Sequence, residues 1–320
     1  MTKLYVICPG DSVTGGPELL HQLVHSVNEL GGFASIVYYP FDIQFEVPDA
    51  YKHYNVKSLQ INEVDKTSNS VVVPEVVTGL TKYFNGMRTF IWWLSVDNYF
   101  KHKEVGVKGL VKSMLRIGNQ LPLSKLKNFE HLVQSAYAKE FLQENGIGSL
   151  MLSDYLNKEH FIKEYDPSLK RDIVCYNPKK GYDVTRKIIE NNPDISFVPI
   201  QNMTSDQVAE LLSESKIYID FGNHPGKDRI PREAAMAGCI VITGIKGSAR
   251  NSVDIPVDRK YKVDESSEYL IANVSNLIRD SFNNYDFFSK DFDVYRDKIV
   301  REEHDFNEEV RKFYQLLVKN

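Results

Sequence analysis

Residues 217–249, with the sequence IYIDFGNHPGKDRIPREAAMAGCIVITGIKGSA, contain the pattern that decides the fold of this chain. The apolar stretch from Ile217 to Phe221 predicts a buried strand, and a polar loop follows it. A helix is expected from about Pro231 to Ala237, because proline is favoured in a first helical turn and a glycine follows the stretch. A second apolar stretch, from Cys239 to Thr243, predicts another strand. Strand, loop, helix and strand in this order indicate a parallel sheet.

The same alternation of strands and helices extends toward the N-terminus. Nearest to this stretch, strands are expected at 172–176 and 196–199 and helices at 181–190 and 205–213, with Ser205 as the cap of the second helix. The first half of the chain predicts strands at 4–8, 34–39, 70–73, 89–94 and 131–134 and helices at 19–30, up to about 84, and at 138–145. The polar segment 157–170 separates the two series. The sequence therefore predicts an α/β protein of two Rossmann-like domains, 1–156 and 157–290, facing a central cleft.

Composition limits the classes of protein to which the chain can belong. Its 320 residues are 42% hydrophobic and 26% charged, which is ordinary for globular domains. The net charge of -4 gives no global basic field for nucleic acid. Three widely spaced cysteines, with no CxxC pair, favour buried free thiols over a disulfide or zinc site. No signal sequence and no apolar run long enough to span a membrane is seen, so a cytoplasmic protein is expected.

The stretch from Arg232 to Val241, REAAMAGCIV, resembles the donor domain of GT-B glycosyltransferases. The resemblance implies that the C-terminal domain binds a nucleotide-sugar, that Glu233 binds the ribose, and that the last helix, 291–320, packs back on the N-terminal domain. Many retaining members carry a glutamate eight positions before this one, where Pro225 stands here. The stereochemistry of the reaction and the donor class therefore stay open.

Two further segments complete the expected donor site. Asn177, Lys179 and Lys180 form the turn after the strand at 172–176, where the family places cations against the donor phosphates; a solvated lysine pair is the alternative. The other expected donor-binding residues lie between the two strands of the first stretch or after them: His224, Gly226, Lys227, Arg229, Arg232 and Ser248. The pair His224-Pro225 also resembles transferases that use CMP-linked acid sugars, such as sialic acid or Kdo, in which this histidine helps to bind the CMP phosphate.

The N-terminal domain is expected to bind the acceptor. Its loop with Gly15, Gly16 and Glu18 resembles the G-G-x-E loop of the same superfamily, which touches acceptor or donor sugar. Asp97 follows a strand that carries both tryptophans, and Asp11 follows the first strand. A carboxylate at either position could act as general base on an acceptor hydroxyl. The catalytic candidates are therefore Asp97, Asp11 and His224.

Residues 101–127 are rich in lysine and arginine. The basic residues are Lys101, Lys103, Lys108, Lys112, Arg116, Lys125 and Lys127, with Glu104 as the opposing charge. Their spacing predicts a basic amphipathic helix, which could lie on the inner face of an anionic membrane; a solvated helix face is the alternative.

These observations favour a metal-independent glycosyltransferase that needs no cofactor and binds no nucleic acid. It would move a sugar to a saccharide or lipid-linked acceptor, in surface polysaccharide or glycolipid synthesis of the bacterial type. The alternatives are a CMP-linked acid sugar transferase, a nucleotide-sugar 2-epimerase and a non-catalytic nucleotide- or sugar-binding protein. The donor sugar, the nucleotide, the linkage and the oligomeric state stay open.

Overall fold

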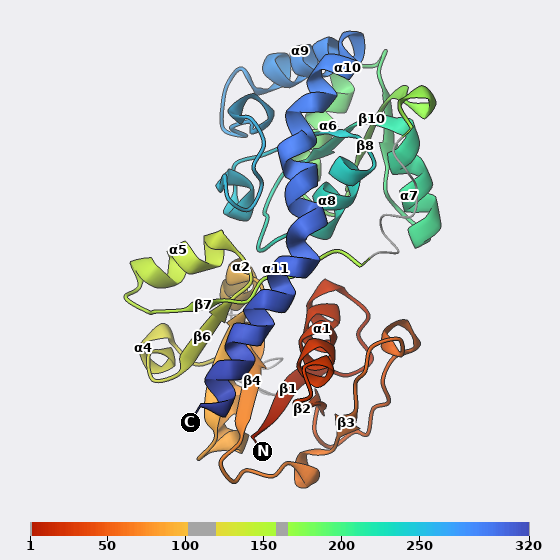
Figure 1. Ribbon diagram of the computed structural model, residues 1–320. Helices are drawn as coiled ribbons and strands as arrows, with labels where there is room; N and C mark the ends of the chain where they lie inside the picture. The colour runs from red at the N-terminus through yellow and green to blue at the C-terminus, as the bar shows by residue number, and fades with distance from the viewer. Residues whose placement is uncertain (1, 102–119, 158–165, 320) are drawn as a thin grey trace. The chain divides into compact units, whose positions relative to one another are not determined.

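The computed structural model describes residues 2–101, 120–157 and 166–319, and the chain divides into two compact units. Unit 1 comprises residues 1–154 and 304–320, and unit 2 comprises residues 155–303. The long helix α11 (Asp293–Val318), in dark blue in Figure 1, therefore contributes its first part to unit 2 and its last part to unit 1.

Unit 1 is built on a parallel sheet of seven strands in the order β3-β2-β1-β4-β5-β6-β7. The strands are β1 (Lys3–Pro9), β2 (Phe33–Tyr39), β3 (Ser58–Leu59), β4 (Ser70–Pro74), β5 (Arg88–Trp93), β6 (Glu130–Val133) and β7 (Leu150–Met151). The α-helices within the unit are α1 (Gly15–Glu29), α2 (Val96–Lys101), α4 (Leu123–Leu126) and α5 (Ala136–Glu144). Shorter 3-10 segments are η1 (Asp49–Tyr51) and η2 (Ile61–Glu63).

The segment after β4 differs from the helix that the sequence predicts. It is a 3-10 segment, η3 (Glu75–Phe84), interrupted at Val77, whose φ of -133° and ψ of 32° are not helical. The carbonyl of Val76 accepts a hydrogen bond from the Gln120 side chain, and the Thr78 hydroxyl accepts one from the Leu121 backbone. These contacts to a distant segment compete with the local hydrogen bonds of an α-helix.

Both tryptophans of unit 1 are completely buried, because the parallel sheet is covered on both faces. The indole N–H of Trp92 donates to the Leu152 carbonyl at 3.0 Å, and that of Trp93 to His131 Nδ1 at 3.0 Å. On one face the last part of α11 packs against the sheet, where the rings of Phe313 and Phe90 lie 5.0 Å apart (Figure 1).

Unit 2 is built on a parallel sheet of four strands in the order β11-β10-β8-β9. The strands are β8 (Arg171–Tyr176), β9 (Ser196–Pro199), β10 (Ser215–Asp220) and β11 (Ile240–Thr243). The helices are α6 (Tyr182–Glu190), α7 (Ser205–Glu214), α8 (Arg229–Met236), α9 (Leu270–Asn283) and α10 (Tyr285–Phe288). The 3-10 segments are η5 (Pro167–Leu169), η6 (Gly247–Arg250), η7 (Arg259–Tyr261) and η8 (Ser289–Phe292).

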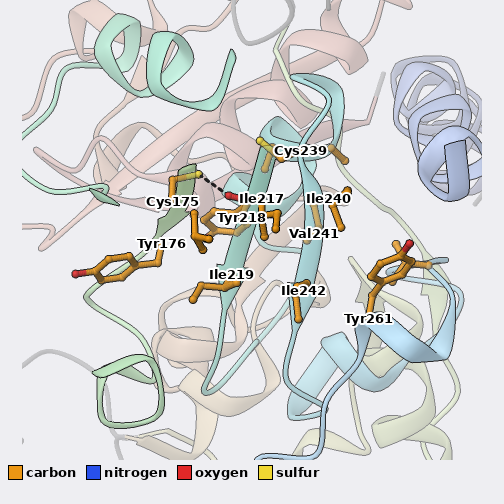
Figure 2. Close-up of a cluster of buried hydrophobic side chains, with 14 of the residues drawn as sticks. Cys175, Tyr176, Ile217, Tyr218, Ile219, Cys239, Ile240, Val241, Ile242 and Tyr261 are labelled. Atoms are coloured by element: carbon orange, nitrogen blue, oxygen red, sulfur yellow. Dashed lines mark hydrogen bonds between the residues drawn. The ribbon is translucent and has the colours of Figure 1, made fainter. Parts of the chain in front are cut away.

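The core of unit 2 is formed by the apolar strands that the sequence predicts. Figure 2 shows β10 between β8 and β11, with Ile217 and Ile219 beside Ile240 and Ile242. The Sγ of Cys175 contacts the Ile217 carbonyl at 3.3 Å. All three cysteines of the chain are free and buried, which confirms the expectation from their spacing.

Two helix starts in unit 2 differ from the sequence expectation by a residue or two. Helix α8 begins at Arg229 rather than near Pro231, because Asp228 is the last residue with extended backbone, at φ -68° and ψ 142°. Helix α7 is capped by Thr204 rather than by Ser205. The Thr204 hydroxyl accepts a hydrogen bond from the Gln207 backbone, and the Gln207 side chain accepts one from the Thr204 backbone in return.

This reciprocal cap leads to a prediction about stability. Replacing Thr204 with alanine is expected to lower the free energy of unfolding by about 1 kcal/mol, because a backbone N–H of the first turn loses its partner. Ser205→Ala is the matched control and is expected to leave stability near that of the wild type. Chemical denaturation of the three proteins measures the difference. Equal losses in the two variants would contradict the assignment of the cap.

Candidate functional site

The polar loops of unit 2 meet at the carboxyl edge of its sheet, between β8 and β10. The chain passes from β8 to β9 on one side and later to β10 on the other, so the direction of the strand order reverses between β8 and β10. Ligands of open parallel sheets bind outside the carboxyl ends of strands at such a point. The loop after β8 holds Asn177, Lys179 and Lys180, and the loop after β10 holds His224, Gly226 and Lys227.

The two loops approach so closely that one contact requires glycine. Gly181 has a φ of +51°, and a Cβ on it would lie 2.3 Å from the carbonyl carbon and oxygen of Phe221. Lys180, one residue earlier, is thereby held against the loop after β10. Its Nζ lies 2.5 Å from Asp228 Oδ2.

Asp228 connects Lys180 to His224. Its Oδ2 lies 2.8 Å from His224 Nδ1, and His224 Nε2 lies 3.2 Å from the backbone carbonyl of Asp220. The side chain of His224 is completely buried, and that of Lys180 is 25% exposed. The Asp220 carboxylate is also buried and accepts a hydrogen bond from the Tyr218 hydroxyl at 2.8 Å. Lysine, histidine and two aspartates thus form one charge cluster at the edge of the sheet.

The carboxylates determine the protonation of this cluster. Burial alone favours a neutral imidazole, but the hydrogen bond that His224 donates to Asp228 and the charges of both aspartates outweigh burial and raise the pKa of His224. Burial also disfavours the charged form of Asp228 and by itself would raise its pKa. The contacts with His224 and Lys180 outweigh burial and hold the pKa of Asp228 below its ordinary value. For Asp220 burial dominates and the pKa is raised. The raised pKa favours the protonated form of His224, in which both ring nitrogens are donors.

A pH dependence of stability follows from the raised pKa of His224. Because the pKa is higher in the folded chain, His224 binds its proton more tightly there than in the unfolded chain. The resulting contribution to the free energy of unfolding is complete below the ordinary pKa of 6.5 and is lost as the pH rises through the pKa of the folded state. The difference in unfolding free energy between wild type and His224→Gln is expected to shrink as the pH is raised across this range. His304→Gln, at an exposed position, is the control and is expected to show no such trend. A difference that stays constant with pH would contradict the charged state.

The same cluster resembles a metal site in composition. The ligand atoms of Asp220, His224 and Asp228 lie within 4.8 Å of one another. However, His224 Nδ1 and the Lys180 ammonium already contact the same oxygen of Asp228, which balances its charge. The geometry therefore favours an ion-pair network over a set of metal ligands.

The loop after β11 completes this edge of unit 2. The hydroxyl of Ser248 donates to the Gly226 carbonyl at 2.6 Å, and the backbone N–H of Ser248 donates to the His224 carbonyl at 2.9 Å. The expected site residue Ser248 is thus buried and holds the loop after β10 in place.

Helix α8 begins directly after the charge cluster. Glu233 lies one turn into the helix and is 7% exposed. Its Oε1 lies 3.0 Å from Nε of Arg229, an expected site residue whose side chain is 44% exposed. The structure thus places a buried carboxylate and a half-exposed guanidinium in the first turns of α8, which directly follows Asp228 of the charge cluster.

Two expected donor-binding residues instead contact the first part of α11. Arg232 Nη1 lies 2.7 Å from Glu302 Oε2, and Lys227 Nζ lies 2.9 Å from Glu302 Oε1. The three side chains are 3%, 6% and 4% exposed. Buried charges need a partner of this kind, so this geometry gives Arg232 and Lys227 a structural role within unit 2.

The turn after β8 separates its two lysines. The Asn177 side chain accepts a hydrogen bond from the Lys179 backbone at 3.0 Å, which fixes the turn, while the Lys179 side chain is exposed. Lys180 alone of the pair joins the charge cluster. The structure therefore distinguishes two residues that the sequence left equivalent.

The expected residues of unit 1 lie at the carboxyl edge of its own sheet. Gly15 and Gly16 open α1, and Glu18 of its first turn is within 3.4 Å of the Tyr54 hydroxyl. Asp97 lies in α2 and accepts a hydrogen bond from the Tyr137 hydroxyl at 2.9 Å. Its second oxygen is buried and, among the described residues, has no hydrogen-bond partner. Asp11 is exposed, with a φ of +50°.

Sequence reasoning missed a buried carboxyl at this edge of unit 1. Glu75 follows β4, is 1% exposed, and accepts a hydrogen bond from the Leu94 backbone at 3.0 Å. Burial raises its pKa to about 8. In unit 2 the sequence pattern did not single out Asp220, Asp228 or Glu302 as site residues. Asp228 stands in the polar loop after β10, so a charged residue there could have been predicted to belong to the site. Nothing in the sequence around Glu302 predicts such a role.

Most of the basic segment 101–127 lies outside the described residues, which omit 102–119. Lys101, Lys125 and Lys127 are described and are exposed. Within the described ranges, no helix has both the length and the apolar character that crossing a membrane requires.

Two units with parallel sheets, each carrying polar loops at its carboxyl edge, make up the GT-B fold, and solved structures with this fold match the chain over nearly its whole length. The chain is similar to HepE from Anabaena, solved in complex with UDP-glucose, with a TM-score of 0.65 and 9% identity, over 98% of this chain and 100% of that one. It is also similar to WaaG, a glycosyltransferase involved in lipopolysaccharide biosynthesis, with a TM-score of 0.60 and 12% identity, over 99% and 100% of the two chains. TarM from S. aureus gives a TM-score of 0.67 and 8% identity, over 99% and 100%.

Similarity in sequence is confined to a shorter stretch. The chain is 27% identical over 120 residues to an alpha-1,6-glucosyltransferase from Actinobacillus pleuropneumoniae serotype 7. The match covers 35% of this chain and 36% of that relative. No family model matches the chain.

Proposed function

We propose that this chain is a glycosyltransferase whose donor nucleotide-sugar is bound at the carboxyl edge of the unit 2 sheet. The observation that carries the proposal is the cluster of Lys180, His224 and Asp228 between β8 and β10, with Glu233 one turn into the helix that follows. A phosphate and a ribose are the groups for which a cation and a buried carboxylate at this place are suited. The GT-B fold and the glucosyltransferase relative support the same activity.

In this proposal Lys180 neutralises the donor phosphates. Transfer of the sugar leaves negative charge on the nucleotide, and a fixed cation beside the leaving oxygen lowers the barrier. His224 acts on Lys180 through Asp228, because both of its ring nitrogens already contact acceptors inside the protein. Glu233 accepts hydrogen bonds from the ribose hydroxyls, with Arg229 as its neighbour.

The acceptor is assigned to unit 1. Asp97 is the preferred general base, since one of its oxygens is held by Tyr137 and the other is without a hydrogen-bond partner in the described part of the chain. Asp11 is the alternative base. A saccharide or lipid-linked acceptor, a pathway of surface polysaccharide or glycolipid synthesis and contact with a membrane through residues 101–127 remain part of the proposal.

The test is a thermal-shift screen with UDP, GDP, dTDP and CMP, followed by turnover of the matching nucleotide-sugars. A ligand that binds only the folded state raises the melting temperature. Transfer to an added saccharide is the expected result, and stabilisation by CMP alone assigns the donor to the CMP-linked acid sugars. Release of free sugar without an acceptor indicates a 2-epimerase, and binding without turnover indicates a binding protein. No stabilisation by any nucleotide would overturn the proposal.

A further inference from the structure

A cavity of about 450 Å³ lies in unit 2 beside β11, the edge strand of the sheet. Its wall is firmly built, because the segment that carries Lys262 pairs with the end of β11: the Val263 backbone donates to the Thr243 carbonyl at 2.8 Å. Ile245 and Val257 supply apolar surface. The cavity is open to solvent on one side, where Arg250 and Arg259 are exposed, so a small polar ligand can reach it.

The charged residues that line this cavity are mostly basic. Arg250, Arg259 and Lys262 line it together with one carboxylate, that of Asp264, and the charge of Asp254 also acts on Lys262. Asp264 is engaged in its own turn, where Oδ1 accepts hydrogen bonds from the Ser266 backbone at 2.9 Å and hydroxyl at 2.7 Å. Among the described residues it makes no ion pair with Arg259 or Lys262. Three cations and one carboxylate thus line the cavity.

Lys262 is the cation most withdrawn from water. Its Nζ donates to the Asn251 carbonyl at 3.0 Å. Burial lowers its pKa to about 8, against the opposing charge of Asp254. A partly dehydrated ammonium gains more from a bound anion than an exposed one does, because less water must be displaced. The guanidinium of Arg259, in contrast, is exposed, and within the described ranges it has no hydrogen bond or ion pair of its own.

We propose that this pocket binds an oxyanion of the phosphate class, carrying two or more negative charges. The guanidinium of Arg259 offers the planar, paired donors that suit phosphate oxygens, Lys262 adds a charge from the more buried side, and Arg250 also lines the cavity. The pocket shares the loop after β11 with the candidate donor site, but its lining contains none of the residues to which donor binding is assigned, Lys180, His224, Asp228 and Glu233. Either a free phosphate ion or a phosphate ester of a substrate has the chemistry required. The proposal does not depend on transferase activity, since the binding takes place without a donor.

The experiment is isothermal titration calorimetry of the whole protein with inorganic phosphate, pyrophosphate and glycerol 3-phosphate, at constant ionic strength. Arg259→Gln is expected to weaken binding roughly tenfold through loss of one charge-assisted contact, and Lys262→Met by at least about as much. Arg186→Gln on α6 is the control and is expected to bind as the wild type does. Lys180→Gln is the comparison that distinguishes this pocket from the candidate donor site, and the anion bound at this pocket is expected to be retained in it. A preference for the ester assigns the pocket to a phosphorylated substrate, and a preference for the free ions assigns it to phosphate itself.

Three results would overturn the proposal. The first is wild-type protein that binds none of the three anions, or binds chloride equally well. The second is full binding by Arg259→Gln, which changes an exposed side chain and is not expected to disturb folding. The third is loss of binding in Lys180→Gln, because the anion would then belong to the donor site. Circular dichroism of each variant shows that the fold is retained, so that loss in Lys262→Met is read as loss of the ligand contact.

Discussion

Alanine in place of Glu233 is expected to lower kcat/KM for the nucleotide-sugar by roughly a thousandfold, since two hydrogen bonds to a charged acceptor contribute about 1.5–3 kcal/mol each. Glu233 is 7% exposed and one turn into α8, so its carboxylate has a fixed position from which to accept both ribose hydroxyls. Glu233→Gln keeps the shape of the side chain and loses the charge, and is expected to lie between alanine and wild type. Steady-state kinetics with the donor identified by the thermal-shift screen measures the effect.

Glu190→Ala is the matched control for this prediction. Glu190 also pairs with an arginine one turn away, Arg186 Nη1 at 3.2 Å, but on an exposed face of α6 in the same unit. Loss of that pair is expected to leave turnover unchanged, because exposed ion pairs contribute little. Similar kinetics for Glu190→Ala and Glu233→Ala would contradict the assignment of Glu233 to the donor site.

Methionine in place of Lys180 is expected to reduce kcat by about 10²–10³, the range seen when one preorganised group that stabilises developing charge is removed. The charge on the leaving nucleotide develops in the transition state, so kcat is expected to fall more than the donor KM rises. Lys179→Met is the control within the same turn: its side chain is exposed and makes no contact with Asp228. Single-turnover kinetics separates chemistry from donor binding.

Two outcomes would contradict the role of Lys180. One is an equal loss of kcat in Lys179→Met and Lys180→Met, which would mean that the turn acts only through its total positive charge and not through the position of Lys180. The other is a rise in KM at unchanged kcat, which would make Lys180 a ground-state contact alone. Thermal melting of both variants is needed beside the kinetics, because Lys180→Met leaves Asp228 with His224 as its remaining partner in the cluster.

Strands and loops could be predicted from the sequence because their signal is local. The stretch from Ile240 to Thr243 is completely buried, and an uninterrupted apolar run is the pattern that a doubly covered parallel strand requires. The loops after β8 and β10 could be placed at one edge for the same reason, since parallel strands end on the same side. The exact start of a helix was less accessible, as Thr204 and Arg229 show: neighbouring polar residues offer nearly equivalent caps.

The ion pairs of Arg232 and Lys227 with Glu302 could not be predicted, because the partners are distant in sequence. Arg232 and Glu302 are 70 positions apart, and nothing in the sequence around either residue indicates the other. The sequence predicts Arg232 and Lys227 as donor ligands from their place in and beside a polar loop, and it does not indicate that both are buried against Glu302. The role of Asp228 likewise depends on the distances to Lys180 and His224, which only the folded chain defines.

Helix α11 has a consequence for the order in which the protein is made. Unit 1 contains residues 1–154, but its sheet is covered by side chains such as Phe313, and the Arg88 guanidinium donates to the Leu316 carbonyl. Unit 2 is contiguous and comprises residues 155–303. The ribosome therefore delivers the first part of unit 1 long before the segment that closes it. The face of the unit 1 sheet at Phe90 therefore has no cover from Phe313 until residues 304–320 have followed unit 2.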